Sequence, residues 1–236
     1  MQGTTHKCGG VALGAVASLA ISKYTGVNVV ETAMILTGAS FGALLPDIDH
    51  KGSEIGRKLK PVANLVCKHT EHRGFTHTTL CAFIVSMVAL ALTSLLQATY
   101  SGTLTYRIVF GCILGFSAWV VFDTLLNSMR PKFVHNYTVR KILDLELPSL
   151  IVLCIFCIVF ADALMATLYM FAWGIAIGYF SHLLLDLFNP TGVPVLYPYS
   201  KQRFSVAKIR TGSHEHAVTF VCNGITVLSI VTMVAL

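Results

Sequence analysis

The sequence predicts an all-α protein that crosses a membrane several times as a helical bundle. Of its 236 residues, 55% are hydrophobic and only 12% are charged, whereas a soluble domain carries about 25% charged residues. The apolar runs are also long enough for helices in a bilayer, and they lack the closely spaced turn signals of strands. Together these observations exclude a water-soluble enzyme or binding domain.

Seven apolar segments follow one another along the chain, and we expect a helix over each of residues 9–22, 31–45, 79–98, 106–126, 148–166, 167–188 and 217–236. The first two are short for a span of about 20 residues, but their many Gly and Ala residues favour close packing between helices. Only Asp162 and a few small residues separate the fifth from the sixth, so the prediction is six to seven transmembrane helices. We expect residues 1–236 to form a single membrane-embedded domain.

The basic residues give this bundle an orientation. With the N-terminus in the cytoplasm, 15 of the 17 Lys and Arg residues fall on the inner side, and only Lys23 and Arg107 fall outside. This bias satisfies the positive-inside rule. The net charge of +6 therefore indicates contact with anionic membrane lipids, and no nucleic-acid partner is expected.

The histidines share the inner side with the basic residues. All nine fall on the inner face or at inner helix ends: His6, His50, His69, His72, His77, His135, His182, His214 and His216. Of the acidic residues, only Glu31 and Asp162 belong to the outer side. Ionisable groups within a membrane protein are costly and commonly functional, so we expect a site at the inner surface.

The first group of candidate site residues is Leu45-Pro-Asp-Ile-Asp-His50, directly after the second apolar segment. Pro46 ends that helix, and Asp47 and Asp49 can bring two carboxylates to one cation. His50 adds an imidazole, and a mixed Asp and His set suits zinc, manganese or iron. Pro-Asp is also an ordinary turn, so a solvated loop between two membrane helices is the alternative.

The second group is His72-Arg-Gly-Phe-Thr-His-Thr78, at the entry to the third segment. The glycine between His72 and His77 lets the backbone turn so that the two rings can converge. Arg73 is placed to bind a phosphate or carboxylate with its planar guanidinium, although it can also be one more inner-side charge. Thr76 is a candidate cap of the following helix.

The third group, His182 and Asp186, lies near the inner end of the sixth segment. On a helix two residues four apart share a face, which suits binding of one metal ion or pairing of a ligand with an orienting partner. A buried hydrogen-bonded pair is the alternative. His6, at the start of the first helix, is a further candidate ligand or else a routine interfacial residue.

Taken in order, these motifs resemble the YdjM family, bacterial inner-membrane proteins described as predicted metal-dependent hydrolases. The resemblance rests on L-P-D-I-D-H with Ser53-x-x-Gly56, on H-R-G-F-T-H-T, and on H-L-L-L-D followed by N-P-T-G-V-P-V-L-Y-P-Y-S. It covers most of the chain, from His6 to about Phe204. It implies a multi-pass location in the bacterial inner membrane and functional roles for Asp47, Asp49, His50, His72, Arg73, His77, His182 and Asp186.

We therefore expect a membrane-bound metal-dependent hydrolase that acts at the cytoplasmic surface on an ester or phosphoester bond of a lipid-linked or amphipathic substrate. One or two divalent ions, zinc or else manganese or iron, would be held by Asp47, His50, His72, His77, His182 and His6. Such an ion lowers the pKa of its water toward ~7. Asp49 or Asp186 would act as general base, and Arg73 would stabilise developing negative charge.

Two other functions fit part of the sequence. A metal-ion or proton transporter would also use intramembrane His and Asp residues, but the candidate ligands gather on one side and the outer half offers little beyond Asp162. A non-catalytic membrane scaffold would explain the basic inner loops, but not the convergence of Asp and His.

Overall fold

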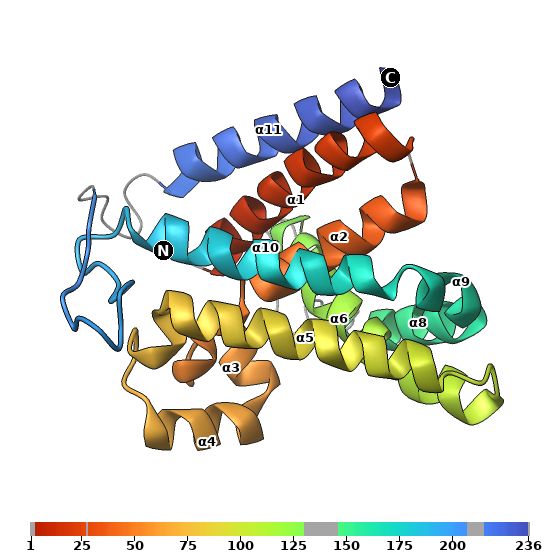
Figure 1. The fold of residues 1–236 in the computed structure, drawn as a ribbon, viewed down its shortest axis with the longest axis horizontal. Helices are drawn as coiled ribbons and strands as arrows, with labels where there is room; N and C mark the ends of the chain where they lie inside the picture. The colour runs from red at the N-terminus through yellow and green to blue at the C-terminus, as the bar shows by residue number, and fades with distance from the viewer. Residues whose placement is uncertain (1–2, 27, 130–145, 207–214, 236) are drawn as a thin grey trace, which may run out of the picture. The chain divides into compact units, whose positions relative to one another are not determined.

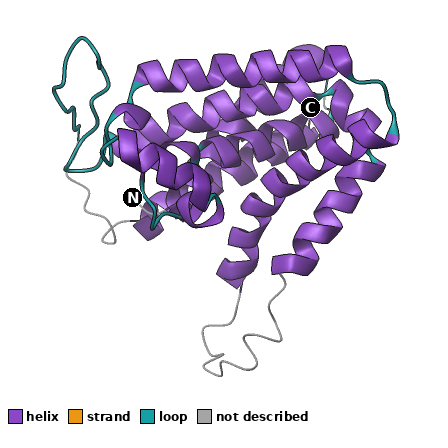
Figure 2. Ribbon diagram, turned by 90° about the horizontal axis from the view of Figure 1, so that it is seen from below, coloured by secondary structure: helices purple, strands orange, loops and turns teal. Residues whose placement is uncertain are grey.

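The computed structural model describes the backbone of residues 3–26, 28–129, 146–206 and 215–235, and within these ranges the chain is mostly helical (Figure 1). The helices are α1 (Gly3–Thr25), α2 (Val29–Gly42), α3 (Glu54–Lys58), α4 (Lys60–His69), α5 (Thr79–Thr99), α6 (Leu104–Met129), α8 (Glu146–Val159), α9 (Ala161–Ala166), α10 (Leu168–Asp186) and α11 (Glu215–Ala235). Loops join them in the described part of the chain, which forms no strand beyond an isolated bridge between Val193 and Phe204 (Figure 2).

Five helical segments are long and apolar enough to cross a membrane: Val29–Asp49, Thr79–Thr99, Leu104–Phe122, Leu168–Asp186 and Glu215–Ala235. A shorter apolar helix covers Leu147–Val159, and α1 contributes 23 further residues rich in Gly and Ala. Each of the seven predicted segments thus coincides with described helix, and the all-α membrane bundle is confirmed. The break between the fifth and sixth segments is a short helix, α9, which separates α8 from α10.

The chain divides into two compact units, residues 1–96 with 167–236 and residues 97–166. All the candidate site residues belong to the first unit. Part of the predicted inner side lies outside the described residues, namely Arg130, Lys132, His135, Arg140, Lys141, Lys208, Arg210 and His214. That these units make up a single functional domain stays a prediction.

In the first unit, helix α10 lies so close to α2 that their backbones touch. A Cβ atom added to Gly42 would lie 2.3 Å from the carbonyl oxygen of Ile175, and one added to Gly178 would lie 1.9 Å from that of Ala39. Side chains larger than hydrogen therefore do not fit unless a helix moves, which is the close packing predicted from the Gly and Ala content. The contact fixes the register of α10 on α2 and sets His182 beside the end of α2.

Helix α5 packs on α10 through a small apolar cluster of Cys81, Ala82, Tyr179 and Leu183. The buried Tyr179 hydroxyl donates a hydrogen bond of 2.6 Å to the backbone carbonyl of Thr76. Because a buried hydroxyl needs a partner, this bond ties the segment before α5 to α10.

The segment between α2 and α5 folds into short pieces. A 3-10 turn over Leu45–Asp49 follows α2, and a second over Phe75–His77 precedes α5. Ser53 caps α3 by accepting from the Gly56 amide, and its hydroxyl donates to the Asp47 carbonyl at 2.7 Å. This pair of bonds explains the Ser53-x-x-Gly56 spacing, because it holds α3 against the first 3-10 turn.

The cap of α5 differs from the expectation. Thr78 accepts a 3.0 Å hydrogen bond from the Cys81 amide at the start of α5. Thr76 instead points its hydroxyl at Asp49. The predicted cap at Thr76 is therefore wrong, because the 3-10 turn moves the helix start downstream and leaves Thr76 inside the turn.

In the second unit, α6 and α8 pack through Gly111 and Gly115, where an added Cβ would lie 2.7 Å from the Ile158 amide nitrogen and 2.6 Å from the Cys154 Cα, respectively. Arg107, near the start of α6, forms an ion pair with Asp162 of α9. Both charged side chains are substantially exposed, which is usual for a solvated ion pair.

Candidate metal centre

Six of the predicted site residues converge at one end of the first unit, where α1, α5 and α11 begin and α10 ends (Figure 1). His6 lies on α1, His77 just before α5, and His182 and Asp186 on the last turns of α10, while Asp47 and Asp49 lie in the 3-10 turn after α2. Five of these six side chains are buried, and Asp47 is partly buried. The group of His6, Asp47, His77, His182 and Asp186 is called the His/Asp cluster below.

The orientation of the His182 ring is fixed by the backbone. Its Nδ1 atom lies 2.7 Å from the carbonyl oxygen of Ala43 at the end of α2. A carbonyl only accepts, so Nδ1 carries the proton and Nε2 presents its lone pair to the cluster. From there Nε2 lies 3.5 Å from Asp186 Oδ2 and 3.8 Å from Asp47 Oδ1.

The His77 ring, in the 3-10 turn before α5, faces the Nε2 atom of His182. Its Nδ1 atom lies 3.3 Å from Asp49 Oδ2, which fixes the ring as a carboxylate does in many histidine ligands. Its Nε2 atom lies 3.2 Å from His182 Nε2, 3.6 Å from Asp47 Oδ1 and 3.5 Å from Asp186 Oδ2. Asp47 Oδ1 and Asp186 Oδ2 thus each lie within 3.8 Å of both ring nitrogens.

The spacing of these atoms suits a small cation. Ligand atoms at ~2.0–2.1 Å from a tetrahedral zinc ion lie roughly 3.3 Å from one another, and the five separations given above run from 3.2 to 3.8 Å. Among the residues that the structure describes, two sets could hold an ion with ligand atoms within 4.8 Å of one another: Asp47, His77 and His182, and His6, His182 and Asp186.

His6 completes the second set from α1. Its ring stacks on that of His182 with centroids 3.7 Å apart, and its Nε2 atom lies 3.5 Å from Asp186 Oδ1. The buried Nδ1 atom of His6 has no hydrogen-bond partner among the described residues. Most buried polar atoms in proteins have a hydrogen-bond partner, so a buried imidazole nitrogen without one is uncommon.

The negative charge of the carboxylates around His77 raises the pKa of its imidazole. Burial disfavours the charged form of this imidazole, but the carboxylates of Asp47 and Asp49 outweigh that cost and raise its pKa to about 9. Near neutral pH the metal-free cluster therefore holds a proton where it could hold a cation.

Asp49 holds the loop that carries His77. Its Oδ2 atom accepts the Arg73 amide at 2.9 Å and the Thr76 hydroxyl, and its Oδ1 atom lies 3.1 Å from Nδ1 of His72. Arg73 has a positive φ of 58°, a conformation that is unfavourable outside glycine. The bond from its amide to Asp49 compensates for this strain and fixes the turn.

Arg73 crosses from this loop to the chain after α10. Its Nη2 atom lies 3.6 Å from Asp186 Oδ1, and its Nη1 atom donates to the Thr191 hydroxyl. The side chain is 15% exposed, so one edge of the guanidinium borders the cluster while part of it still meets solvent.

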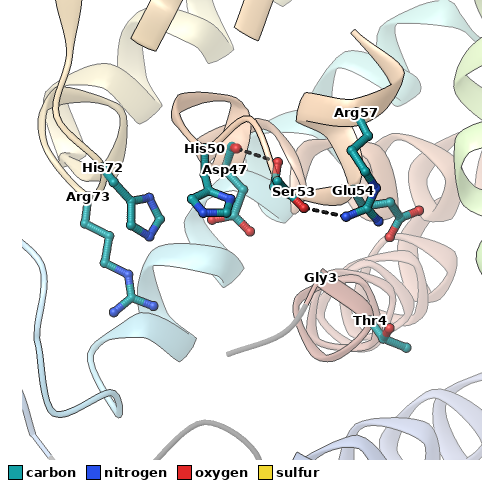
Figure 3. A pocket seen from close by; sticks show the side chains of 10 residues that line it. Gly3, Thr4, Asp47, His50, Ser53, Glu54, Arg57, His72 and Arg73 are labelled. Carbon is teal, nitrogen blue, oxygen red and sulfur yellow. Dashed lines mark hydrogen bonds between the residues drawn. The ribbon is translucent and has the colours of Figure 1, made fainter. Parts of the chain in front are cut away.

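His50 and His72 occupy a different place from the cluster. Together with Asp47 and Arg73 they line a pocket of about 450 Å³ beside it, and neither belongs to the two sets that could hold an ion (Figure 3). Their rings lie 4.9 Å apart, and both residues are exposed. Of the nine residues proposed from the sequence, the structure gathers six in the buried region and three, His50, His72 and Arg73, around the pocket.

Three contributors to this region were not singled out from the sequence: Thr76 as a donor to Asp49, and the pair of Lys7 and Glu54, whose Nζ and Oε1 atoms lie 2.6 Å apart beside the pocket. Thr76 belongs to the H-R-G-F-T-H-T motif, so its hydroxyl was a visible signal. The sequence carries no such signal for a pair 47 residues apart.

Comparison with known proteins gives relatives over most of the chain. A family model described as YdjM inner membrane protein matches residues 1–129 and 147–235. Inner membrane protein YdjM of Escherichia coli K12 is 25% identical over 196 residues, which cover 83% of this chain and 65% of that protein, and the YdjM protein of Shigella flexneri matches equally. The chain therefore spans slightly less than two thirds of these relatives.

A further relative is the uncharacterized protein YvsG of Bacillus subtilis strain 168. It is 29% identical over 141 residues, which cover 59% of this chain and 78% of that protein. No solved structure matches the chain significantly.

Proposed function

The chain belongs to the YdjM family of inner membrane proteins, and we propose that it is a metal-dependent hydrolase that acts at the cytoplasmic surface of the bacterial inner membrane. The relatives and the apolar helices make it a multi-pass protein of that membrane. The names of the relatives state no reaction, so the proposal depends on the geometry of the site.

One observation carries the proposal. The Nε2 atoms of His77 and His182 face each other at 3.2 Å, while the Nδ1 atoms of both rings face acceptors on Asp49 and Ala43. Two neutral rings so arranged would point lone pairs at each other, which is unfavourable unless a proton or a metal ion lies between them. The carboxylates of Asp47 and Asp186 each supply a further ligand atom beside these two nitrogens.

The donor set fits a transition metal. Imidazole nitrogens with carboxylate oxygens suit zinc, manganese or iron, whereas magnesium and calcium prefer oxygen alone. Asp47, His77 and His182 would hold one ion, and His6, His182 and Asp186 form a second, overlapping set. When bound, such an ion lowers the pKa of water and polarises the bond to be cleaved.

In this proposal the remaining residues have different roles, which we infer from their contacts. Asp49 already accepts from Arg73 and Thr76, so we assign it a positioning role in place of the proton transfer expected from the sequence. Asp186 lies among the ligand atoms. His72, held by Asp49 through Nδ1 and exposed in the pocket, is then the group best placed to pass a proton to or from the substrate.

Arg73 is placed to stabilise negative charge that develops on the substrate. It borders both the cluster and the pocket, and its planar guanidinium can donate two parallel hydrogen bonds. On the orientation predicted from the basic residues the site lies at the inner ends of membrane helices, so we expect an amphipathic or lipid-linked substrate to reach it from the membrane surface.

A transporter is supported less well by the distribution of polar groups. Among the described residues the buried Asp, Glu, His and Lys side chains are His6, Lys7, Asp49, His77, His182, Asp186 and Glu215, and all lie at the same end of the first unit. An ion path needs polar groups through the middle of the bundle. There α2 and α10 touch through glycine and backbone instead.

The test compares Arg73→Lys with Arg203→Lys, a control at an exposed arginine in the same unit. Lysine keeps the charge but loses the planar fork. Turnover of a carboxylic ester or phosphoester substrate should fall roughly 10- to 100-fold in Arg73→Lys, on the scale of ~1.4 kcal/mol per decade, while metal content stays unchanged. Arg203→Lys should keep full turnover.

The same preparations are placed in liposomes to measure flux of the bound metal. Flux of the metal without turnover of any ester would contradict the hydrolase. Turnover that is weakened by Arg73→Lys, with no flux, would exclude the transporter.

A further inference from the structure

Helix α4 (Lys60–His69) lies outside the His/Asp cluster but is attached to it. The helix packs on α3 and on the 3-10 turn over Leu45–Asp49, at the margin of the first unit (Figure 1). The thiol of Cys67 donates a hydrogen bond of 3.1 Å to the backbone carbonyl of Asp49. Helix α4 is therefore fixed to the turn that carries two of the predicted site residues.

The apolar side of α4 is wider than the surface that the protein covers. Ala63 is buried and Val66 is half-buried. Val62 and Leu65, in contrast, are 47% and 60% exposed. Residues three and four apart are neighbours on a helix, so Val62, Leu65 and Val66 share one side. One half of this apolar side packs on the protein, and the other half is uncovered.

The opposite side of α4 is polar and basic. Lys60, Asn64 and Lys68 follow one another at intervals of four residues, and all three are exposed. No acidic residue occurs between Glu54 and Glu71, so no carboxylate on the helix offsets the two lysines. An apolar side next to a basic side is typical of a helix that lies at a membrane surface.

The connections of α4 keep it close to the membrane. The candidate span Val29–Asp49 ends in the turn on which α4 packs, and the next span begins at Thr79. On the orientation predicted from the basic residues, both spans reach the cytoplasmic surface here. The uncovered Val62 and Leu65 are therefore beside the inner leaflet.

A bilayer that contains anionic lipid matches both sides of α4. An interfacial helix buries its apolar side ~5–10 Å into the boundary between headgroups and acyl chains, which removes apolar side chains from water. Lysines on such a helix extend their charged ends toward the headgroups, and the negative potential of the cytoplasmic leaflet attracts them.

We propose that α4 is an interfacial helix that inserts Val62 and Leu65 into the inner leaflet and binds anionic phospholipid headgroups through Lys60 and Lys68. Through the bond from Cys67, the helix holds the turn over Leu45–Asp49 at the depth of the headgroups. This membrane-binding surface requires neither a bound metal nor hydrolysis, so it can be tested apart from both.

The test places a single copy of the full chain in a lipid nanodisc. Trp119→Phe and Trp173→Phe first remove the two native tryptophans. A new tryptophan is introduced on the uncovered apolar side, as Leu65→Trp or Val62→Trp, or on the polar side, as Asn64→Trp. The discs contain equal amounts of phosphatidylglycerol and phosphatidylcholine, and only one of the two lipids carries bromine on its acyl chains, where bromine quenches a tryptophan that it contacts.

The tryptophan in Leu65→Trp and Val62→Trp should emit at shorter wavelength than the one in Asn64→Trp, and brominated lipid should remove most of its emission, because it lies within the leaflet. If one of the two apolar-side variants does not fold, the other supplies the comparison. Quenching by brominated phosphatidylglycerol should exceed quenching by brominated phosphatidylcholine, because the lysines attract the anionic lipid.

The lysines are tested in the Leu65→Trp chain. Lys60→Gln together with Lys68→Gln should abolish the preference for phosphatidylglycerol, whereas Lys23→Gln, exposed at the far end of α1, should preserve it.

Three results would overturn the proposal. Equally weak quenching in Leu65→Trp and Asn64→Trp would show that the uncovered side faces water. Emission at short wavelength that neither lipid quenches would show that protein covers this side. Equal quenching by the two brominated lipids, or a preference that survives without Lys60 and Lys68, would show that these lysines do not select anionic headgroups.

Discussion

Two aspartates of this protein, Asp186 in the first unit and Asp162 in the second, have opposite surroundings. Asp186 is 1% exposed and lies within 3.6 Å of three imidazoles and of the Arg73 guanidinium. Asp162 is 58% exposed and pairs with Arg107. Both residues lie within the predicted apolar segments, so only the surroundings distinguish them.

The comparison distinguishes an aspartate in an exposed ion pair from a buried aspartate in a candidate binding site. An exposed ion pair contributes about 0–1 kcal/mol and needs no further explanation. A buried carboxylate costs several kcal/mol of desolvation, which only close compensating groups offset. Keeping Asp186 among three histidines is therefore costly for folding alone, and it is reasonable if these residues bind a cation.

Replacement of Asp186 should have the largest effect. Asp186→Ala removes one ligand of the proposed ion and should weaken metal affinity by more than ~100-fold. Mutation of a residue that only orients a ligand already lowers metal affinity ~10–100-fold. Asp162→Ala is the matched control and should leave metal affinity unchanged, with a stability change within about 1 kcal/mol. Titration with zinc and a competing chelator measures both.

Equal metal affinities in the two variants would remove the distinction between the two aspartates. Asp186 would then be a buried structural group, and the cluster would be a hydrogen-bonded network.

Asp49→Asn should have the next largest effect. The amide keeps the shape of the side chain, but it is a weaker acceptor for the Arg73 amide and for His77. The loop that carries His77 should loosen, and metal affinity should fall about 10- to 100-fold. Glu71→Gln, an exposed acid in the same loop, is the control and should bind metal normally. Wild-type affinity in Asp49→Asn would show that His77 is held by other contacts.

Taken per pH unit, the response of metal affinity to pH is the smallest of these effects. In the metal-free protein the pKa of His77 is raised to about 9, so a metal ion must displace its proton. Apparent metal affinity should therefore rise about tenfold per pH unit until pH reaches about 9 and then level off. His182, Asp47, Asp49 and Asp186 are the ionisable groups around this ring.

The metal-free protein should show the opposite trend. A group with a raised pKa in the folded state stabilises below its ordinary value near 6.5 and loses that contribution as pH rises through about 9. The free energy of unfolding of the metal-free chain should therefore fall over this interval. A stability that is flat with pH, in the metal-free and metal-loaded chain alike, would contradict a carboxylate-held proton on His77.

The membrane fold was largely predictable because apolar length and charge bias depend on composition alone. The seven segments and their Gly and Ala packing appear in the structure where the pattern places them. That α9 is a separate short helix was not predicted, since residues 161–166 formed the end of the predicted fifth segment. Its ends depend on packing that a hydropathy pattern does not contain.

For the site, the sequence indicated which residue types gather but not what each would contact. His72 and His77 belong to one motif, yet only the ring of His77 faces the point that His182 shares. That choice depends on the turn held by Asp49 and on Arg73 in its left-handed conformation. Arg57 reads as one more inner-side charge, because nothing in its local sequence shows that α3 folds back over the pocket.

The central claim is that the His/Asp cluster binds a transition metal, and elemental analysis of the purified protein tests it most directly. The wild-type chain should carry about one or two equivalents of zinc, manganese or iron. His77→Ala should lose the metal, and His69→Ala, at an exposed histidine on α4, should retain it. A wild-type chain that stays free of metal after incubation with zinc, manganese and iron, or a His77→Ala chain that keeps a full complement, would contradict the account.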